Sequence, residues 1–430
     1  MGSYWTLTAG RRTLSAGKNY LRDSIALLFT DSELTVKIDP STSDAEDDAD
    51  RKLVADVFEY TSTVRRLRSR LAMQGFGQAR AYEAALGYLR DVPSDPEEAY
   101  RFSEEESSRY DTPMDLLNAV VDWAAKHYWT SVANDAASKY LDEVWRDLIE
   151  CFDDPRFAIS LLIRGARANT AVKLDLSDCV MGGWLEPDER PHLTASARLS
   201  SRVSSSGPVI VVTEGRTDAL FMRRALALAD PGVAHQFTFL DFESTAAPGG
   251  VDQVVRLTRS LAAAGVVNRV IAILDNDAAG NQAAGTLRRS SLPSHFSVRV
   301  LPDVKYAKKY PTIGPDGVSA ADVNGRAVTI EMMFGEAVLR HAGNGNLPPV
   351  RWGGPIGSSG VYQGAIEFKR QAQDAVSAAL DLGHSLEQLD PGVAEGCRSL
   401  TSLLIDAASN INPMMTSEFS PLLLERVRQA

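Results

Sequence analysis

The sequence predicts an α/β protein built around a parallel sheet. The strongest indication is Val209–Val212, four consecutive β-branched residues of the kind found in a strand buried on both faces of a parallel sheet. Further apolar runs follow and alternate with helical patterns, which is the order of elements in α/β proteins. The expected strands are Val209–Thr213, Phe237–Phe242, Val270–Leu274 and Phe296–Leu301, and the expected helices are Thr217–Ala229, Val251–Ala264 and Asn281–Arg289.

The residues before this segment predict a mixed, largely helical domain. Short β-prone segments at Ser3–Thr8 and Leu34–Ile38 indicate a small sheet. Apolar residues then recur at three- and four-residue spacing, as in amphipathic helices. The expected helices are Leu53–Gln74, Ala79–Leu89, Pro113–Tyr128 and Leu141–Phe152, and two further strands are expected at Val172–Leu176 and Val180–Leu185. The serine-rich Ser200–Pro208 predicts a linker or surface loop.

The chain of 430 residues is long enough for two or three domains. We expect an N-terminal domain at 1–198, an α/β domain at 207–335 and a helical C-terminal region at 345–430. The two flanking parts show apolar helical periodicity but no clustered acid or base residues. They are therefore expected to assemble around the central domain or to mediate self-association.

The composition restricts the classes of function. The formal net charge of −11 argues against a polybasic protein that grips nucleic acid with its whole surface. It is compatible with an enzyme that has carboxylates at its centre and local basic patches for a nucleic-acid backbone. The three cysteines lack the close pairing of zinc and redox motifs, and no apolar stretch is long enough to span a membrane. We expect a cytoplasmic protein without a membrane partner.

Acidic residues follow two of the predicted strands. Glu214 and Asp218 come after the first strand, and Asp275 and Asp277 come after the third. The carboxyl ends of parallel strands share one edge of a sheet, where ligands bind in open α/β folds, so the two motifs are expected to converge. Carboxylate oxygens are hard ligands that suit Mg²⁺ or Mn²⁺. Taken alone, the aspartate pair would more often be a solvated turn that caps a helix.

The two motifs together, E-G-x-x-D and then D-x-D-x-x-G about sixty residues later, resemble the TOPRIM domain of topoisomerases, bacterial primases and a group of nucleases. The resemblance covers about residues 207–305. It implies a Rossmann-like parallel sheet with Glu214 as the acid/base or metal-proximal carboxylate, and Asp275 and Asp277 as metal ligands. Asp218 can face the same site or cap the helix that begins there.

A third acidic position follows the TOPRIM-like segment. Thr329-Ile-Glu331-Met-Met-Phe resembles the segment with which some TOPRIM nucleases of the overcoming-lysogenization-defect family supply another metal-site carboxylate. That resemblance implies that Glu331 is a further metal ligand. The alternative is a capping or solvated glutamate in the first turn of a helix.

Three N-terminal segments carry a second resemblance. Met1–Tyr4, Val64–Gly75 and Val172–Asp178 are similar to the N-terminal domains found beside HEPN or TOPRIM modules in bacterial conflict systems. A working HEPN ribonuclease would need an arginine and a histidine a few residues apart on one helix. His127 and His192 lack that partner, so we assign no HEPN catalysis to this region.

Two basic clusters could hold a phosphate backbone. The first consists of Arg65, Arg66, Arg68 and Arg70 on a predicted helix. Its alternative is a solvated helix face. The second consists of Lys305, Lys308 and Lys309, with Tyr306 and Tyr310 between and after them. It joins charge to stackable rings just after the fourth strand, so its lysines are the expected substrate-binding residues.

These features predict a nuclease that depends on Mg²⁺ or Mn²⁺. The chain has too little sequence outside the TOPRIM-like segment for the gate of a topoisomerase, and it has neither the zinc module nor the fold of a primase. The substrate is DNA or RNA, and no base-reading motif favours either. The two resemblances together imply antiphage defence, with self-association or a partner defence protein. The alternative is a non-catalytic module that senses nucleic acid or nucleotide and acts with a partner.

Overall fold

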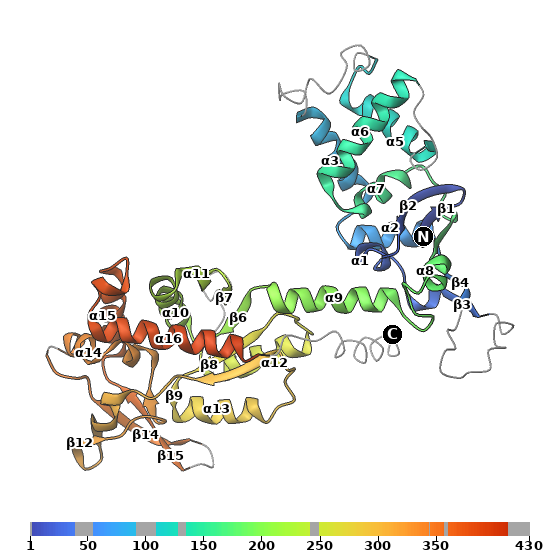
Figure 1. Cartoon of the computed structure of the whole chain (residues 1–430). Coiled ribbons are helices and arrows are strands. Elements are labelled where there is room, and N and C mark those ends of the chain that lie inside the picture. Colours follow the sequence, from blue (N-terminus) through green and yellow to red (C-terminus); the bar gives the residue numbers. More distant parts are fainter. Residues whose placement is uncertain are drawn as a thin grey trace. The chain divides into compact units, whose positions relative to one another are not determined.

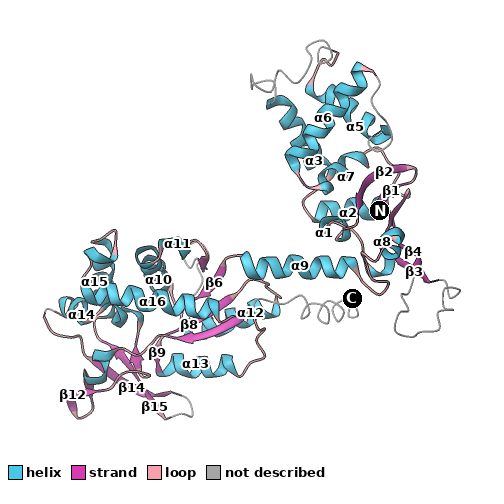
Figure 2. Ribbon diagram, in the orientation of Figure 1, coloured by secondary structure: helices cyan, strands magenta, loops and turns pink. Residues whose placement is uncertain are grey.

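A computed structural model describes residues 2–38, 55–91, 109–127, 135–240, 249–343, 345–356 and 360–411. The chain divides into two compact units, with the boundary between Arg198 and Leu199. Both units combine helices with sheets, and one sheet is parallel, so the fold is mixed α/β (Figures 1 and 2). Within the described part of the chain, no helix is both long and apolar enough to cross a membrane.

The first unit contains a five-stranded antiparallel sheet. Its strands are β1 (Tyr4–Ala9), β2 (Arg12–Lys18), β3 (Leu34–Ile38), β4 (Ala55–Thr63) and β5 (Ala171–Asp175), in the order β2-β1-β5-β4-β3. Burial alternates along β1 and along the described side chains of β4, as in a sheet that turns one face to the core. Leu7, Phe58 and Tyr60 thereby enter one hydrophobic cluster.

Helices pack against this sheet and complete the first unit. They are α1 (Asp23–Ala26), α2 (Val64–Met73), α3 (Gln78–Asp91), α5 (Pro113–His127), α6 (Ala136–Phe152), α7 (Pro155–Leu162) and α8 (Ser177–Met181), followed by α9 (Pro191–Ser206), in which the boundary between the units falls. The helices expected at 79–89, 113–128 and 141–152 are present, and Tyr128 lies outside the described residues.

Three local predictions for the first unit are wrong. The first half of the helix expected at Leu53–Gln74 is strand β4, because these residues alternate in burial and pair with β3 and β5. The strand expected at Val180–Leu185 is the end of α8 and the turn after it. Most of the linker expected at Ser200–Pro208 continues α9, since serine costs a helix little and no glycine or proline interrupts the segment before Gly207.

The second unit is built on a four-stranded parallel sheet. Its strands are β6 (Val209–Val212), β7 (Phe237–Phe239), β8 (Val270–Leu274) and β10 (Phe296–Val300), in the order β10-β8-β6-β7. All four expected strands are present, although residues 241 and 242 lie outside the described part. The chain passes from β6 to β7 on one side and then crosses to β8 on the other. The topology therefore reverses between β6 and β8, where open α/β sheets bind their ligands.

Helices cover both faces of the parallel sheet. α10 (Arg216–Ala229) and α16 (Pro391–Ser409) lie on one face, and α12 (Val251–Ala263) and α13 (Ala278–Arg288) lie on the other (Figure 1). Strand residues alternate between the two cores: Val211 and Ile273 pack on the side of α10, whereas Val212 and Ala272 pack on the side of α12. All of β8 is buried, as a central strand of such a sheet requires.

The C-terminal part of this unit contains a further sheet as well as helices. The strands β11 (Tyr310–Gly314), β12 (Gly317–Ala321), β14 (Val350–Ile356) and β15 (Val361–Ile366) form it in the order β12-β11-β14-β15. Helices α14 (Glu336–Ala342), α15 (Lys369–Asp381) and α16 accompany it. The expectation of a helical region at 345–430 is therefore wrong for its beginning, where the hairpin of β14 and β15 lies.

A buried ion pair holds α2 against the sheet of the first unit. Glu33, in the short helix η1 (Asp31–Glu33), accepts from both Nη atoms of Arg70 at 2.6 and 3.0 Å and from Ser62 Oγ at 2.7 Å. Burial alone would raise the pKa of Glu33, but the hydrogen bonds from Arg70, Ser62 and Thr30 outweigh it and hold the pKa below its usual value. The carboxylate therefore contributes stability in its ionised form.

We predict that Glu33→Gln lowers the free energy of unfolding by about 3 kcal/mol, the scale for breaking a buried ion pair. A lowered folded-state pKa gives stability above the unfolded-state value and loses it as the pH falls through the folded-state value. The native protein should thus lose stability in acid more steeply than the variant. Calorimetric unfolding of the full chain between neutral pH and the acid range measures both effects, and Glu83→Gln on exposed α3 surface is the matched control. Identical acid profiles for the native and Glu33→Gln proteins would contradict this role.

Candidate active site

Glu214 and Asp275 lie at the carboxyl edge of the parallel sheet, where its topology reverses. Glu214 follows β6, Asp275 directly follows β8, and these two strands are neighbours. The backbone N–H of Asp275 donates to Oε1 of Glu214 at 2.9 Å. The backbone of Glu214 is also held from the other side, because its carbonyl accepts the Gly250 N–H at 2.6 Å. The structure thus brings the two acidic motifs together.

Asp218 joins the same group from the first turn of α10. Its Oδ2 accepts the Gly215 N–H at 2.9 Å, so it caps the helix. Burial, and then the negative charges of Glu331 and Glu214, raise the pKa of Asp218 to about 7. Asp218 therefore caps the helix and also lies close enough to Glu331 and Glu214 to feel their charges.

Asp277 also has a structural role. It caps α13 by accepting the Gly280 N–H through Oδ1 at 2.7 Å, and its Oδ2 accepts from Nε2 of Gln363 at 2.6 Å. Gln363, on β15, accepts in turn from the Ala279 N–H at 3.0 Å. Glycine is needed at 280, since a Cβ there would lie 2.2 Å from the carbonyl oxygen of Asp275. The helix cap was the alternative for this aspartate, and the structure contains it.

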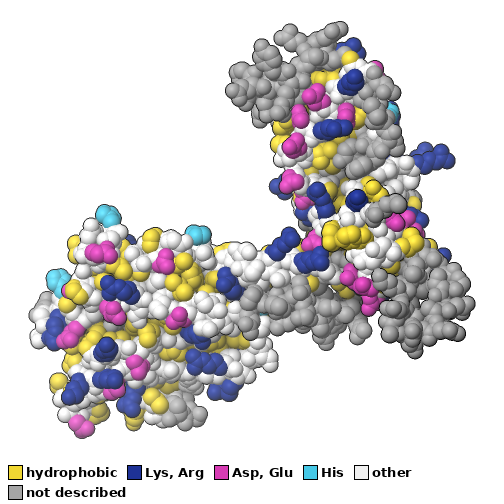
Figure 3. Space-filling view, in the orientation of Figure 1, with side chains coloured by type: hydrophobic (Ala, Val, Ile, Leu, Met, Phe, Trp, Pro, Cys, Tyr) yellow, Lys and Arg dark blue, Asp and Glu magenta, His cyan; other side chains and the backbone are white. Residues whose placement is uncertain are grey.

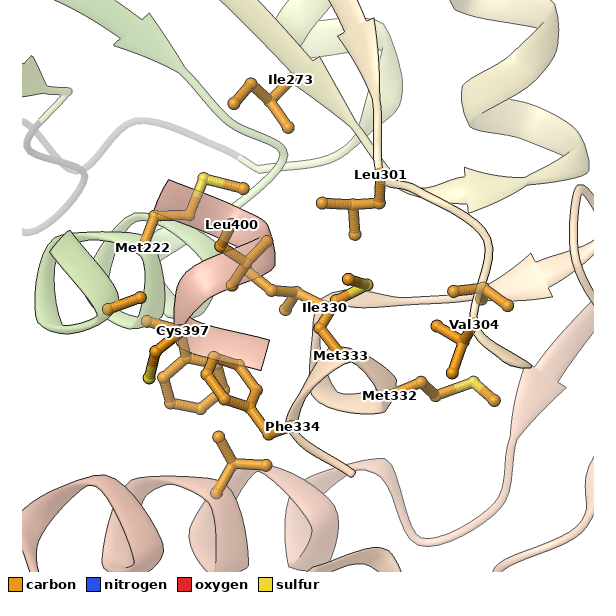
Figure 4. Packing of buried hydrophobic residues seen from close by; sticks show 14 of the residues in the cluster. Met222, Ile273, Leu301, Val304, Ile330, Met332, Met333, Phe334, Cys397 and Leu400 are labelled. Atoms are coloured by element: carbon orange, nitrogen blue, oxygen red, sulfur yellow. The ribbon is translucent and has the colours of Figure 1, made fainter. Parts of the chain in front are cut away.

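Glu331 reaches the site from η6 (Ile330–Phe334), a short helix anchored in the core. Figure 4 shows its apolar side chains among residues of β8, α10 and α16: the labelled neighbours include Ile273, Met222, Cys397 and Leu400. Just before η6, strand β13 (Ala327–Val328) pairs with β9 (Asn276–Asp277). This pairing places the Glu331 segment beside the second acidic motif.

The carboxylate of Glu331 is fully buried, and one of its two oxygens accepts a hydrogen bond from a described residue. Its Oε1 accepts from Nε2 of Gln373 at 2.7 Å. Its Oε2 is buried and has no hydrogen-bond partner among the described residues. A buried acceptor without a donor is costly, so this oxygen marks a position at which a cation or a water molecule would be stabilised.

Lys369 supplies the positive charge of the site, and the sequence analysis missed it. Its Nζ lies 4.0 Å from Oε1 of Glu331, and it stands one turn before Gln373 on α15. Burial opposes its protonation, but Glu331, Asp275, Asp218 and Glu214 outweigh burial and raise the pKa of Lys369. Nothing in its local sequence distinguishes it from an ordinary lysine at the start of a helix, because only the tertiary fold brings it to the carboxylates.

The carboxylates raise one another's pKa. Burial is the largest cause for Asp275, followed by the charges of Asp218 and Glu214, and together they raise its pKa well above the usual value although Lys369 opposes them. The pKa of Glu214 is raised by burial and by Asp277, against the hydrogen bond from Asp275. Closely spaced acids in a buried site favour either protonation or a bound cation.

The donor set fits a hard divalent cation in its chemistry. It offers carboxylate oxygens from Glu214, Asp275, Asp277 and Glu331, and one oxygen of Glu331 is buried with no partner in the described part of the chain. Across the described residues, however, no three Asp, Glu, His or Cys side chains have their ligand atoms already gathered for a metal ion. Side chains that now bond to the protein, as Asp277 does, would have to share or exchange those bonds with the ion.

The predicted substrate-binding lysines are exposed, but the rings beside them are not. Lys305, Lys308 and Lys309 lie in η5 (Lys305–Lys309) with exposed side chains. Tyr310 is fully buried, and the hydroxyl of Tyr306 donates to the Met332 carbonyl at 2.6 Å. The expectation of rings available for base stacking is therefore wrong, because the rings pack into the core and tie η5 to η6. In Figure 3, Lys and Arg side chains are spread among acidic and apolar ones on the drawn face.

The arginine cluster of the first unit serves mainly to hold that unit together. Arg70 pairs with Glu33, and Nη2 of Arg68 donates to the carbonyls of Ile163 and Ala166 at 2.7 and 2.8 Å. The cluster is therefore neither a free phosphate-binding face nor a simple solvated one.

His192 is buried beside Tyr60, whose hydroxyl lies 2.9 Å from Nδ1.

The fold and the site define an α/β protein with an acidic site at the switch point of a parallel sheet. Residues 1–201 match the model of the family described as HEPN/Toprim N-terminal domain 1. The N-terminal part of the chain is thus similar to that family, as its sequence resemblance predicted. No curated protein and no solved structure matches the chain.

We predict that the metal-free protein becomes less stable as the pH rises through about 7, the pKa of Asp218. A carboxyl whose folded-state pKa is raised stabilises the fold while it is protonated, and that stability is lost as the pH rises through the folded-state value. Asp218→Asn keeps an acceptor for the Gly215 N–H but cannot ionise, so it should flatten this loss. Thermal unfolding in EDTA from pH 5 to pH 9 tests it, with Asp230→Asn at the other end of α10 as control. A native protein whose stability is constant over this range would contradict the assignment.

Proposed function

We propose that this protein is a TOPRIM-type nuclease that hydrolyses phosphodiester bonds of DNA or RNA with the help of Mg²⁺ or Mn²⁺. The observation that carries the proposal is the acidic group around Lys369, in which Oε2 of Glu331 is buried and has no partner among the residues that the structure describes. Its position at the switch point of a parallel sheet is where such folds bind ligands. The similarity of residues 1–201 to a HEPN/Toprim N-terminal domain supports a nuclease-associated role, and we extend it to antiphage defence.

The residues of the site divide into ion-holding, proton-handling and charge-neutralising groups. Asp275, Asp277 and Glu331 would hold the divalent cation, and Glu214 would lie next to it as the acid/base or metal-proximal carboxylate. Such an ion, when bound, lowers the pKa of water and neutralises charge on the phosphate. Asp218, which lies beside these carboxylates, would take up a proton from the attacking water.

Lys369 places an ammonium group where a phosphate would meet the carboxylates. Its side chain is half exposed, so it can contact a substrate while it remains paired with Glu331. Hydrolysis forms a bond from the water oxygen to phosphorus and breaks the bond from phosphorus to the leaving oxygen. One proton moves from the water to a carboxylate, and the leaving oxygen takes up a proton from solvent. The lysine stabilises the negative charge of the phosphate oxygens throughout.

A second candidate function is a binding or sensing module without catalysis. It is favoured by the hydrogen bonds that already occupy both oxygens of Asp277 and by the ligand atoms that are not yet gathered around an ion. The purified protein should be incubated with labelled DNA, structured RNA and transfer RNA, with Mg²⁺ or Mn²⁺ and with EDTA. Cleavage that EDTA abolishes supports the nuclease, whereas binding that is insensitive to metal and gives no cleavage supports the module.

We predict that Asp275→Asn and Asp277→Asn reduce metal affinity and turnover together, because the amide keeps the size of the side chain but loses the charge that binds a hard cation. Glu214→Gln should reduce turnover by about 10²-fold or more while substrate binding persists, if Glu214 handles a proton. Excess Mn²⁺ should rescue the aspartate variants in part and leave Glu214→Gln inactive.

Metal titrations by calorimetry and single-turnover cleavage measure these effects. Asp316→Asn, on the exposed turn between β11 and β12, removes the same charge away from the site and is the control. Full metal-dependent activity in the Asp275→Asn/Asp277→Asn double variant would overturn the site. Equal rescue of all three variants by Mn²⁺ would make Glu214 another metal ligand.

We predict that the triple variant Lys305→Ala/Lys308→Ala/Lys309→Ala binds nucleic acid more weakly and with a flatter salt dependence, because each lost phosphate contact removes roughly 0.7–0.9 from the slope of log affinity against log salt. The exposed lysines Lys37, Lys126 and Lys139 of the first unit provide a control triple with the same change of charge. Fluorescence anisotropy at several salt concentrations measures the slope. A slope equal to that of the control triple would show that η5 does not contact the substrate.

A further inference from the structure

A polar groove runs along α13 beside the acidic site. It is a hollow of about 400 Å³ between α13 and the start of β15, with Val361 and Gly325 opposite the helix. We call it the α13 groove, and the helix lines it with Asn281, Gln282, Gly285, Thr286 and Arg289. Its volume lies within the range of small-molecule sites, roughly 300–1,000 Å³.

The α13 groove begins next to the second acidic motif. It begins at Ala278, the residue after Asp277. Nδ2 of Asn281 donates to the Asp277 carbonyl at 2.8 Å, so one groove residue is bonded to the backbone of the acidic motif. Gly325 precedes Arg326, which forms a β-bridge with Asp277. The groove thus starts beside the backbone of Asp277.

The chemistry of the groove contrasts with that of the site. Among the described residues that line it, none is acidic and none is aromatic. The amide of Asn281 and the hydroxyl of Thr286 already donate within the protein. The Gln282 amide and the Arg289 guanidinium suit phosphate and sugar oxygens, whereas a base would need a ring to stack on. Arg289 is exposed and makes no hydrogen bond or ion pair to the described residues.

Gly285 gives the helix a surface on which the Arg289 side chain can lie. A Cβ at position 285 would stand 3.3 Å from Nη1 of Arg289, and it would project into the groove. Glycine inside a helix costs about 1 kcal/mol relative to alanine. The space that Gly285 leaves beneath the Arg289 guanidinium explains why a glycine stands at a helix position where it lowers helix stability.

We propose that the α13 groove holds the sugar-phosphate backbone of a nucleic-acid strand next to the bond that is cut, with Arg289 on a phosphate and the amide of Gln282 on a neighbouring oxygen. This proposal rests on the nuclease function and adds the path of the substrate. It assigns to the groove the recognition of a strand by its backbone and not by its bases, so the groove takes strands irrespective of sequence.

Binding in EDTA tests the groove separately from catalysis. Labelled single-stranded DNA and RNA oligonucleotides are titrated with the native protein and with Arg289→Ala, and Arg256→Ala on exposed α12 surface is the control for charge. We expect about tenfold weaker binding for Arg289→Ala, the scale of one charge-assisted hydrogen bond, and native affinity for Arg256→Ala. The two oligonucleotides show which strand the groove accepts.

A second pair of variants blocks the groove without changing charge. Gly285→Leu fills it, and Gly87→Leu places the same side chain on α3, where a Cβ at 87 meets no other atom within 4 Å. We expect weaker binding for Gly285→Leu alone, with thermal unfolding confirming that both variants fold. Native affinity in both Arg289→Ala and Gly285→Leu, or no oligonucleotide binding by the native protein, would overturn the groove. Weakened binding in these variants together with no cleavage by the native protein would instead leave the groove standing and refute the nuclease.

Discussion

The main constraint on the second unit is the electrostatic repulsion between several carboxylates that lie close together in a partly buried space. Like charges in such a space repel one another, and burial removes the water that would screen them. Backbone N–H groups, two glutamines and Lys369 offset part of this repulsion. The remaining repulsion raises the pKa values of Asp218 and Asp275. Oε2 of Glu331 is buried and has no hydrogen-bond partner among the described residues. This residual negative potential is what makes the site suited to a divalent cation.

Apolar packing is what holds these charges in place. Glu331 is carried by η6, whose other side chains all enter the main core of the unit. Asp275 follows a strand that is buried along its whole length, and Gly280 lets α13 begin directly against it. The rigid elements are therefore hydrophobic, and the polar groups sit at their ends. Such an arrangement can keep charged groups close together without relying on their mutual attraction.

The parts of the site that follow a strand could be predicted from sequence, because an uninterrupted β-branched run fixes both the strand and the residue at its end. This is why Glu214 and Asp275 could be expected to meet. Lys369 and Gln363 could not, since they arrive from the C-terminal segment through contacts that no local pattern encodes. The prediction that the tyrosines of η5 stack on bases was wrong for a similar reason. The alternation of lysines and tyrosines in the sequence does not show which side chains are buried. In the first unit, the apolar spacing of α2 masked the shorter alternation of β4 before it.

We expect the carboxylates around Lys369 to bind a divalent cation. Crystals of the full chain grown with Mn²⁺, measured at a wavelength where manganese scatters anomalously, test this binding most directly. We predict an anomalous peak among the carboxylates of Glu214, Asp275 and Glu331, and its loss in Asp275→Asn crystals. A crystal structure in which Mn²⁺ is bound at full occupancy at another site, while Lys369 alone neutralises Glu331, would contradict this expectation.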